Sequence, residues 1–235
     1  MDSRTQIAYS EKAQEYSQDW LSQPEPSDMY ELLKKYFVAK GQTADIGCGN
    51  GRDSNWLASQ GYEVTGYDSS DELVQIASNL FPNIKFKKAA LPALDEISNH
   101  FDNVICETVI MHLRLEQIRN SIASLKRILK GNGVLYLSWR VTENQDTRHS
   151  DGRLYSAFDP QFILDQFEKN GILHFEDKIS TSSGKRVCRL IFQKKNSYLV
   201  SRINVVGTSG SGKSTFSKKL ASKLNCPYIE LDQIF

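Results

Sequence analysis

The stretch Thr43-Ala44-Asp45-Ile46-Gly47-Cys48-Gly49-Asn50-Gly51 places three alternate glycines between a short strand-like run and a helix-like segment, Arg52–Gln60. Glycine is needed where the backbone turns with positive φ and where a ligand lies against the main chain. In open α/β sheets, ligands bind at the carboxyl ends of the strands, beside the point where the strand order reverses. This turn is therefore predicted to hold a ligand, and a purely structural turn is the alternative.

Helix signals and strand signals alternate around this turn. Residues 23–26 carry two prolines and separate two N-terminal helical segments, and Ser27 is predicted to cap the second. Asp68-Ser69-Ser70 and Asp159-Pro160 are further helix starts. The second of these is expected to run to Asn170-Gly171 and to bury Phe162, Ile163 and Phe167. An apolar stripe at helical spacing, Leu115 to Leu129, marks another helix.

Seven strands are predicted, five of them separated by helices. They are Thr43–Ile46, Tyr62–Tyr67, Ile84–Lys88, Phe101–Cys106, Gly133–Trp139, Ile172–Ile179 and Arg186–Gln193. Strands that alternate with helices favour a parallel sheet covered on both faces, and the last two strands favour an antiparallel hairpin. The predicted fold is α/β, a doubly wound Rossmann-like sheet over residues 1–196.

An acidic residue, Asp68, ends the second predicted strand, 17 residues after Gly51. A carboxylate at that position accepts hydrogen bonds from both ribose hydroxyls of an adenosine. The glycine spacing is GxGxG and not the GxGxxG of dinucleotide enzymes, so no pyrophosphate has to be held. The pattern therefore favours an adenosine ligand without a pyrophosphate.

Over residues 10–195 these motifs resemble the class I S-adenosylmethionine-dependent methyltransferases. The first family motif matches Asp45–Gly51, and the acid that ends strand two matches Asp68. Phe101–Ile105 is similar to the family's fourth strand, and residues 125–133 are similar to its turn into strand five. Many relatives carry an acid after strand three that binds the adenine amino group, whereas this chain has Lys88-Ala89-Ala90-Leu91-Pro92-Ala93-Leu94.

The resemblance implies the residues that would bind S-adenosylmethionine. Asp68 would bind the ribose, Asp45 would order the glycine loop, and Glu107 would face the methionine end or the sulfonium. Main-chain contacts of Ala90 and packing of Leu91 on the adenine would replace the missing acid. Tyr16, in a helix that caps the pocket in similar enzymes, would face the sulfonium, or would only pack between helices. The remaining implied contacts come from Gly47, Cys48, Gly49, Gly51 and Ser69.

For the transfer step, an activated methyl group requires alignment of the acceptor and removal of its proton. His112 is the predicted base, because the pKa of a histidine lies near the operating pH. Glu107 is a second catalytic candidate. A merely packed or solvated His112 is the alternative. In similar enzymes the segment 140–158 lines the acceptor site, so Arg140, Arg153 and Tyr155 are predicted to bind substrate; a solvated loop is the alternative.

A second glycine loop, Gly207-Thr208-Ser209-Gly210-Ser211-Gly212-Lys213-Ser214-Thr215, fits the phosphate-binding pattern GxxxxGK[ST]. Backbone N–H groups would cradle phosphates, Lys213 would reach the terminal phosphates, and Ser214 would hold magnesium. The predicted phosphate-binding residues are Gly207, Gly210, Gly212, Lys213, Ser214 and Thr215. With a strand over Arg202–Val206, a helix over Phe216–Leu224 and a strand over Tyr228–Asp232, residues 197–235 resemble the start of a P-loop kinase. We expect this β-α-β unit to be incomplete, with Mg-ATP as a minor candidate ligand and no kinase turnover.

Composition narrows the class of protein. A net charge of +1 and the absence of an Asn/Asp-Pro-Pro-aromatic motif after strand four argue against nucleic acid as the acceptor. No apolar run reaches membrane-spanning length, and the four cysteines are scattered, so we expect a cytoplasmic protein without a metal site. The predicted function is methyl transfer to a small-molecule acceptor, which the sequence does not identify. The alternatives are a P-loop ATP-binding protein and a non-catalytic S-adenosylmethionine-binding protein.

Overall fold

A seven-stranded sheet organises the computed structural model, which describes residues 2–195, 203–208, 210–224 and 227–229. The strand order is β3-β2-β1-β4-β5-β9-β8, and the strands from β3 to β5 are parallel. β9 pairs antiparallel with both β5 and β8, which confirms the predicted doubly wound sheet and its closing hairpin. The strands are β1 (Gln42–Ile46), β2 (Glu63–Asp68), β3 (Lys85–Lys88), β4 (Phe101–Cys106), β5 (Leu129–Arg140), β8 (Ile172–Ile179) and β9 (Arg186–Gln193).

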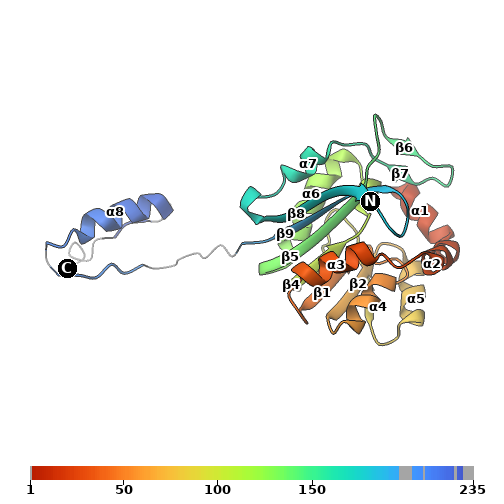
Figure 1. Cartoon of the computed structure of the whole chain (residues 1–235), viewed down its shortest axis with the longest axis horizontal. Coiled ribbons are helices and arrows are strands. Elements are labelled where there is room, and N and C mark those ends of the chain that lie inside the picture. The colour runs from red at the N-terminus through yellow and green to blue at the C-terminus, as the bar shows by residue number, and fades with distance from the viewer. Residues whose placement is uncertain (1, 196–202, 209, 225–226, 230–235) are drawn as a thin grey trace. The chain divides into compact units, whose positions relative to one another are not determined.

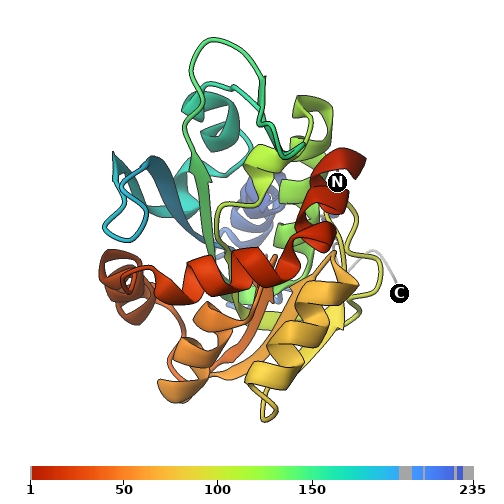
Figure 2. The same cartoon turned by 90° about the vertical axis from the view of Figure 1, so that its right-hand side faces the viewer.

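Helices cover both faces of the sheet (Figures 1 and 2). On one face, α3 (Ser27–Tyr36) and α4 (Arg52–Ser59) supply Met29, Leu33 and Leu57 to a buried cluster. On the other face, α6 (Leu115–Arg127) and α7 (Pro160–Leu164) pack on a larger cluster that includes Val104, Leu137 and Leu190. The alternating side chains of the strands thus serve two cores.

Two N-terminal helices, α1 (Ser3–Glu11) and α2 (Ala13–Ser22), are tied to the carboxyl ends of the first strands. Gln6 donates to the Ser69 carbonyl (3.1 Å), Asn50 donates to the Ser17 carbonyl (3.0 Å), and Arg52 donates to the Trp20 carbonyl (3.1 Å). These bonds hold α1 and α2 beside the first glycine turn.

Helix starts agree with the sequence at two positions and differ at one. Ser70 caps α5 (Asp71–Leu80) by accepting from the Leu73 N–H, and Asp159 caps α7 by accepting from the Gln161 N–H. The prediction that Ser27 caps α3 is wrong, because the helix already begins at Ser27 and Pro26 is its N-cap. α7 is also shorter than predicted and ends at Leu164, and a 3₁₀ turn, Lys169–Gly171, precedes β8.

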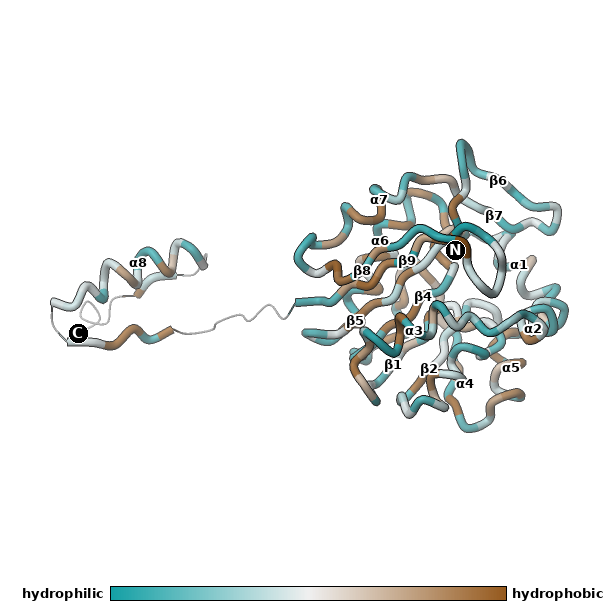
Figure 3. The backbone as a smooth tube through the Cα atoms, in the orientation of Figure 1, coloured by the Kyte–Doolittle hydropathy of each residue, from teal (hydrophilic) through white to brown (hydrophobic). Residues whose placement is uncertain are grey.

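The segment after β5 contains structure that the sequence did not reveal. β6 (Thr147–Arg148) and β7 (Leu154–Tyr155) form a small antiparallel ladder. In Figure 3 this segment is largely hydrophilic, and the hydrophobic stretches follow the central strands. The Leu154 N–H donates to the Thr5 hydroxyl of α1 (2.9 Å), so the ladder and the N-terminal helices are joined.

Residues 197–235 form a compact unit separate from residues 1–196. Its helix, α8 (Lys213–Leu224), begins at the lysine of the second glycine loop, and Gly210 and Gly212 both have φ of +78°. The predicted strand over Arg202–Val206 is wrong for Ile203–Val206, which is irregular, because a strand needs a neighbour for its backbone groups. Arg202 and Glu230–Asp232 lie outside the described residues, and Tyr228–Ile229 is irregular. In the parts of the chain that the structure covers, no helix has the length and hydropathy of a membrane span.

Candidate functional site

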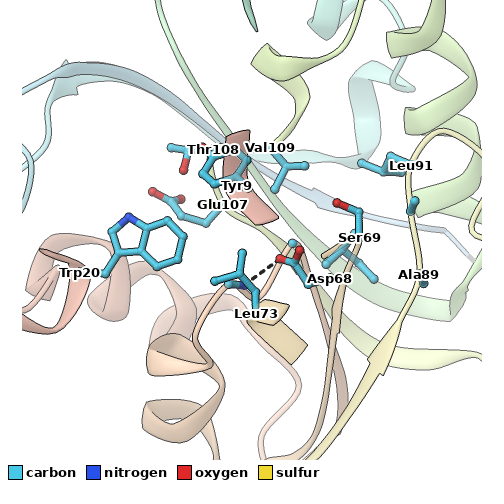
Figure 4. A pocket seen from close by; sticks show the side chains of 14 residues that line it. Tyr9, Trp20, Asp68, Ser69, Leu73, Ala89, Leu91, Glu107, Thr108 and Val109 are labelled. Carbon is cyan, nitrogen blue, oxygen red and sulfur yellow. Dashed lines mark hydrogen bonds between the residues drawn. The ribbon is translucent and has the colours of Figure 1, made fainter. Parts of the chain in front are cut away.

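A pocket lies at the carboxyl ends of β1, β2 and β4, where the strand order reverses between β1 and β4. It is partly open to solvent, and its lining combines apolar side chains with a few polar groups, as is usual for small-molecule sites. In Figure 4, Glu107 and Trp20 lie at one end of the pocket, Leu91 and Ala89 lie at the other, and Asp68 lies between them. Its lining residues are Tyr9, Trp20, Ile46, Gly47, Gly49, Asp68, Ser69, Leu73, Ala89, Ala90, Leu91, Glu107, Thr108 and Val109.

Two glycines of the first turn allow the pocket to form. Gly47 has φ of +77°, and a Cβ atom there would lie 2.3 Å from Cγ2 of Val109. Gly49 has φ of +55°, and its Cβ would lie 2.8 Å from the Trp20 ring. A side chain at either position would therefore be strained and would collide with the pocket wall.

The third glycine of the turn, Gly51, was expected to contact the ligand but is absent from the pocket lining. It is the N-cap of α4 with φ of +82°, and a Cβ there would lie 2.7 Å from the Phe86 ring. Gly51 therefore allows close packing behind the pocket.

Asp68 is fixed at the centre of the pocket by main-chain donors. One carboxylate oxygen accepts from the Gly49 N–H (2.9 Å), and the other accepts from the Ser70 N–H (3.0 Å). Burial raises the pKa of Asp68, although these hydrogen bonds oppose the effect. Because the side chain is held in one rotamer and still borders the pocket, its remaining lone pairs can accept two adjacent hydroxyl groups.

Glu107 follows β4, and side chains of the neighbouring strand β5 hold its carboxylate in place. Its Oε2 accepts from the Tyr136 hydroxyl (2.7 Å) and from the Ser138 hydroxyl (2.5 Å), both on β5. Burial raises the pKa of Glu107. Within residues 2–195, Oε1 has no hydrogen-bond partner in the structure, so this oxygen can accept from a ligand.

His112 lies deeper than predicted, and it is 2% exposed. Its Nδ1 lies 2.6 Å from the Leu154 carbonyl, which only accepts, so the proton is on Nδ1. Nε2 therefore accepts from the Tyr9 hydroxyl at 2.9 Å. Burial lowers the pKa of His112 to about 4, so the premise that this imidazole titrates near neutral pH is wrong. His112 reaches the pocket only through Tyr9, which lines it.

Three other predicted cofactor residues lie outside the pocket lining. The Asp45 side chain points toward α4, where it accepts from the Ser54 hydroxyl (2.6 Å), and burial raises its pKa to about 7. The Cys48 side chain is buried against Gly66 of β2. Tyr16 donates to Asp151 (3.1 Å) and stacks on Trp20 at 5.8 Å between ring centroids, so Trp20 occupies the place expected for Tyr16.

The predicted substrate residues gather near Tyr9 but differ in their partners. Arg153 forms an ion pair with Asp151 (2.8 Å), and its guanidinium lies over the rings of Tyr9, Tyr16 and Tyr155 at 4.7–5.8 Å. Tyr155 is buried, and its ring meets that of His112 edge-on at 4.8 Å. Among the described residues, the Arg140 side chain has no carboxylate partner of this kind.

Several lining residues were missed in the sequence. Ala90 and Leu91 were named for the adenine end, and both line the pocket, but Ala89 and Leu73 beside them were not named. Tyr9 and Trp20 were missed because only tertiary structure shows which aromatic side chains of α1 and α2 face the turn. One signal in the sequence could have pointed to Trp20: Gly49 has no side chain, and this leaves room for a large aromatic ring beside the turn.

Comparison with known proteins gives this site its class. Residues 44–133 match the family model described as a methyltransferase domain. The ubiquinone biosynthesis O-methyltransferase of Rickettsia typhi is 31% identical over 145 residues, which are 60% of this chain and 56% of that protein. The chain spans about half the length of the curated relatives it matches, at 56% and 49% for two of them.

Solved structures share the fold at low identity. The 1,6-didemethyltoxoflavin-N1-methyltransferase of Burkholderia thailandensis, solved with S-adenosylhomocysteine, has a TM-score of 0.66 at 16% identity, over 82% of this chain and 88% of that one. The [4+2]-cyclase SpnF has a TM-score of 0.59 at 18% identity, over 72% and 80%. Residues 44–133 therefore match a methyltransferase domain, the comparisons support S-adenosylmethionine as the methyl donor, and the fold is also that of a cyclase, so the same fold supports other chemistry.

Proposed function

We propose that this chain transfers the methyl group of S-adenosylmethionine to a small-molecule acceptor by in-line displacement. The observation that carries the proposal is the position of Asp68, held by two main-chain N–H groups at the centre of a pocket between Leu91 and Glu107. This arrangement supplies one contact for each part of the cofactor.

The cofactor would lie along the pocket with its adenosine toward β2 and β3. Asp68 would accept both ribose hydroxyls, and Leu91 with Ala89 and Ala90 would pack on the adenine. Glu107 would bind the ammonium group of the methionine part through its open oxygen. The rings of Tyr9 and Trp20 would face the sulfonium, whose positive charge favours aromatic faces.

In the transfer step, a lone pair of the acceptor attacks the methyl carbon while the carbon–sulfur bond breaks. The bonding pair stays on sulfur, which gives neutral S-adenosylhomocysteine. The protein's main contribution is alignment at near-attack distance. Because the Tyr9 hydroxyl donates to His112, its oxygen presents only lone pairs to the pocket and would accept a hydrogen bond from an acceptor hydroxyl. We therefore assign His112 a positioning role, acting through Tyr9.

A hydroxyl oxygen is the acceptor atom we favour. The Tyr9 oxygen provides a hydrogen-bond acceptor for a hydroxyl group, and the proton released when the hydroxyl oxygen gains the methyl group would pass to solvent, since the pocket is partly open and His112 is a weak base. The curated relative from Rickettsia typhi is also named as an O-methyltransferase. The acceptor would enter from the side of β5 and the β6–β7 ladder, where Arg140, Arg153 and Tyr155 lie.

Incubation with S-adenosylmethionine labelled in its methyl group and a small-molecule cell extract tests the proposal. Transfer of label to an organic product, with an equal amount of S-adenosylhomocysteine formed, is the expected result. Binding of S-adenosylmethionine without any labelled product would instead identify a non-catalytic binding protein.

We also propose that residues 197–235 retain a phosphate-binding loop, separate from the methyltransferase domain of residues 1–196. The supporting observation is that α8 starts at Lys213, directly after two glycines of positive φ, which is where a phosphate would meet the helix N-terminus. The Lys213 ammonium donates to the Thr208 carbonyl (2.6 Å) and would have to leave it to reach a phosphate. Titration with Mg-ATP of the wild-type chain and of Lys213→Ala tests this proposal; equal heats from the two proteins would refute it.

A further inference from the structure

Arg140, the last residue of β5, carries a charge without a partner beside the pocket. Its Nε is buried and has no hydrogen-bond partner, and within residues 2–195 no ion pair of its side chain is found. Four other arginines of the same half of the chain are neutralised by carboxylates: Arg148 by Asp2, Arg153 by Asp151, Arg186 by Asp177, and Arg189 by Asp28. Desolvation of part of a guanidinium without compensation is costly.

The direction of the Arg140 side chain follows from the pleat of β5. Tyr136 and Ser138 lie on one face of this strand and bond to Glu107, and Arg140 is the next residue on that face. Its charge also acts on both neighbours: it opposes the rise that burial causes in the pKa of Tyr9, and it adds to the lowering that burial causes in the pKa of His112. Arg140 therefore lies beside the end of the pocket that holds Glu107 and Tyr9.

We propose that Arg140 binds a carboxylate carried by the methyl acceptor, and that the acceptor is a planar, ring-containing organic acid. This inference rests on the proposed methyl transfer, since it assigns the acceptor of the same site. One uncompensated positive charge matches the single negative charge of a carboxylate better than the double charge of a phosphate monoester. Flat aromatic walls, supplied by Tyr9 and Trp20, favour a ring next to them.

The division of labour between the two arginines is part of the proposal. Arg153 already has its charge neutralised by Asp151 and its plane covered by tyrosine rings, so it shapes the wall next to the acceptor. Arg140 has neither and is free to form a bidentate pair with a carboxylate.

Calorimetric titration in the presence of saturating S-adenosylhomocysteine tests this inference. The probes are benzoate, 3,4-dihydroxybenzoate and 4-hydroxycinnamate, each paired with its neutral methyl ester, together with phenyl phosphate. We expect at least one acid to bind about 10-fold or more tightly than its ester. Arg140→Gln should remove this preference, and Arg4→Gln, which removes the same charge from an exposed position of α1, should keep it.

Three other outcomes would contradict the proposal. No preference for any acid over its ester, tighter binding of phenyl phosphate than of every acid, or an unchanged preference in Arg140→Gln would each overturn the carboxylate site. S-adenosylhomocysteine binding is measured first in each protein. Its absence in the wild type would count against the proposed function, and its retention in Arg140→Gln would show that the variant is folded.

Discussion

Single hydrogen bonds decide which chemistry the pocket residues are able to perform. The carbonyl of Leu154 fixes the proton of His112 on Nδ1, and this in turn makes Tyr9 a donor toward His112. With its pKa lowered to about 4 by burial, the imidazole is neutral at pH 7 and is a weak base. His112, the base predicted from the sequence, is thus placed to position the Tyr9 hydroxyl.

Glu107→Gln tests the assignment of the methionine end. The variant keeps an oxygen for Tyr136 and Ser138 but loses the negative charge, so the affinity for S-adenosylmethionine should fall about 10-fold or more. The affinity for 5′-methylthioadenosine, which lacks the amino acid part, should stay within about twofold. Calorimetry with both ligands measures this difference, and equal losses for both would contradict the assignment.

At the scale of elements, the start of α5 joins the second strand to the pocket. The Ser70 hydroxyl accepts from the Leu73 N–H (3.2 Å), and the Ser70 N–H donates to Asp68 (3.0 Å). The same residue therefore caps the helix and helps to fix Asp68, the residue proposed to bind the ribose.

Ser70→Ala should destabilise the domain by about 1 kcal/mol, the usual cost of a lost N-cap. The expected result in urea is a lower midpoint with an unchanged slope. Ser59→Ala is the control, because this exposed hydroxyl has only local partners, the Trp56 carbonyl and the Gln60 side chain. A midpoint for Ser70→Ala equal to that of Ser59→Ala would contradict the role of the cap.

The strands were predictable because their signals are local, whereas the pocket was only partly so. Flanking turn residues and strand-like apolar patterns predicted β4, β8 and β9 at the bounds that the structure has; burial alternates along β8 and is almost continuous along β4 and β9. The lining by Tyr9 and Trp20 depends on how two helices cross the sheet, which no local pattern encodes. Likewise, the sequence does not reveal that Arg153 has a carboxylate partner, whereas Arg140 has none in the part of the chain that the structure describes.

At the scale of the whole molecule, the free energy of unfolding should depend on pH because of the buried carboxyl group of Asp45. Burial raises the pKa of Asp45 from the ordinary aspartate value of 3.8, which applies in the unfolded chain, to about 7 in the folded protein. The folded protein therefore binds this proton more tightly than the unfolded chain does. The contribution of this group to stability is therefore present below pH 4 and is lost as the pH rises to about 7.

Asp45→Asn removes this loss and still accepts from Ser54. The free energy of unfolding of the variant, relative to wild type, should rise between pH 4 and pH 7 by up to about 4 kcal/mol, since one pKa unit corresponds to about 1.4 kcal/mol. Urea unfolding at several pH values measures this difference. A difference independent of pH would show that Asp45 is ionised throughout.

The central claim, that the first glycine turn and Asp68 bind S-adenosylmethionine, is tested most directly by one calorimetric comparison. Wild type, Asp68→Ala and the matched control Asp71→Ala are titrated with S-adenosylmethionine; Asp71 lies three residues further on, with its side chain 69% exposed. We predict tight binding by wild type and Asp71→Ala, and a loss of about 1.5–3 kcal/mol, roughly 10- to 150-fold, in Asp68→Ala. Equal affinity of Asp68→Ala and wild type would contradict the account.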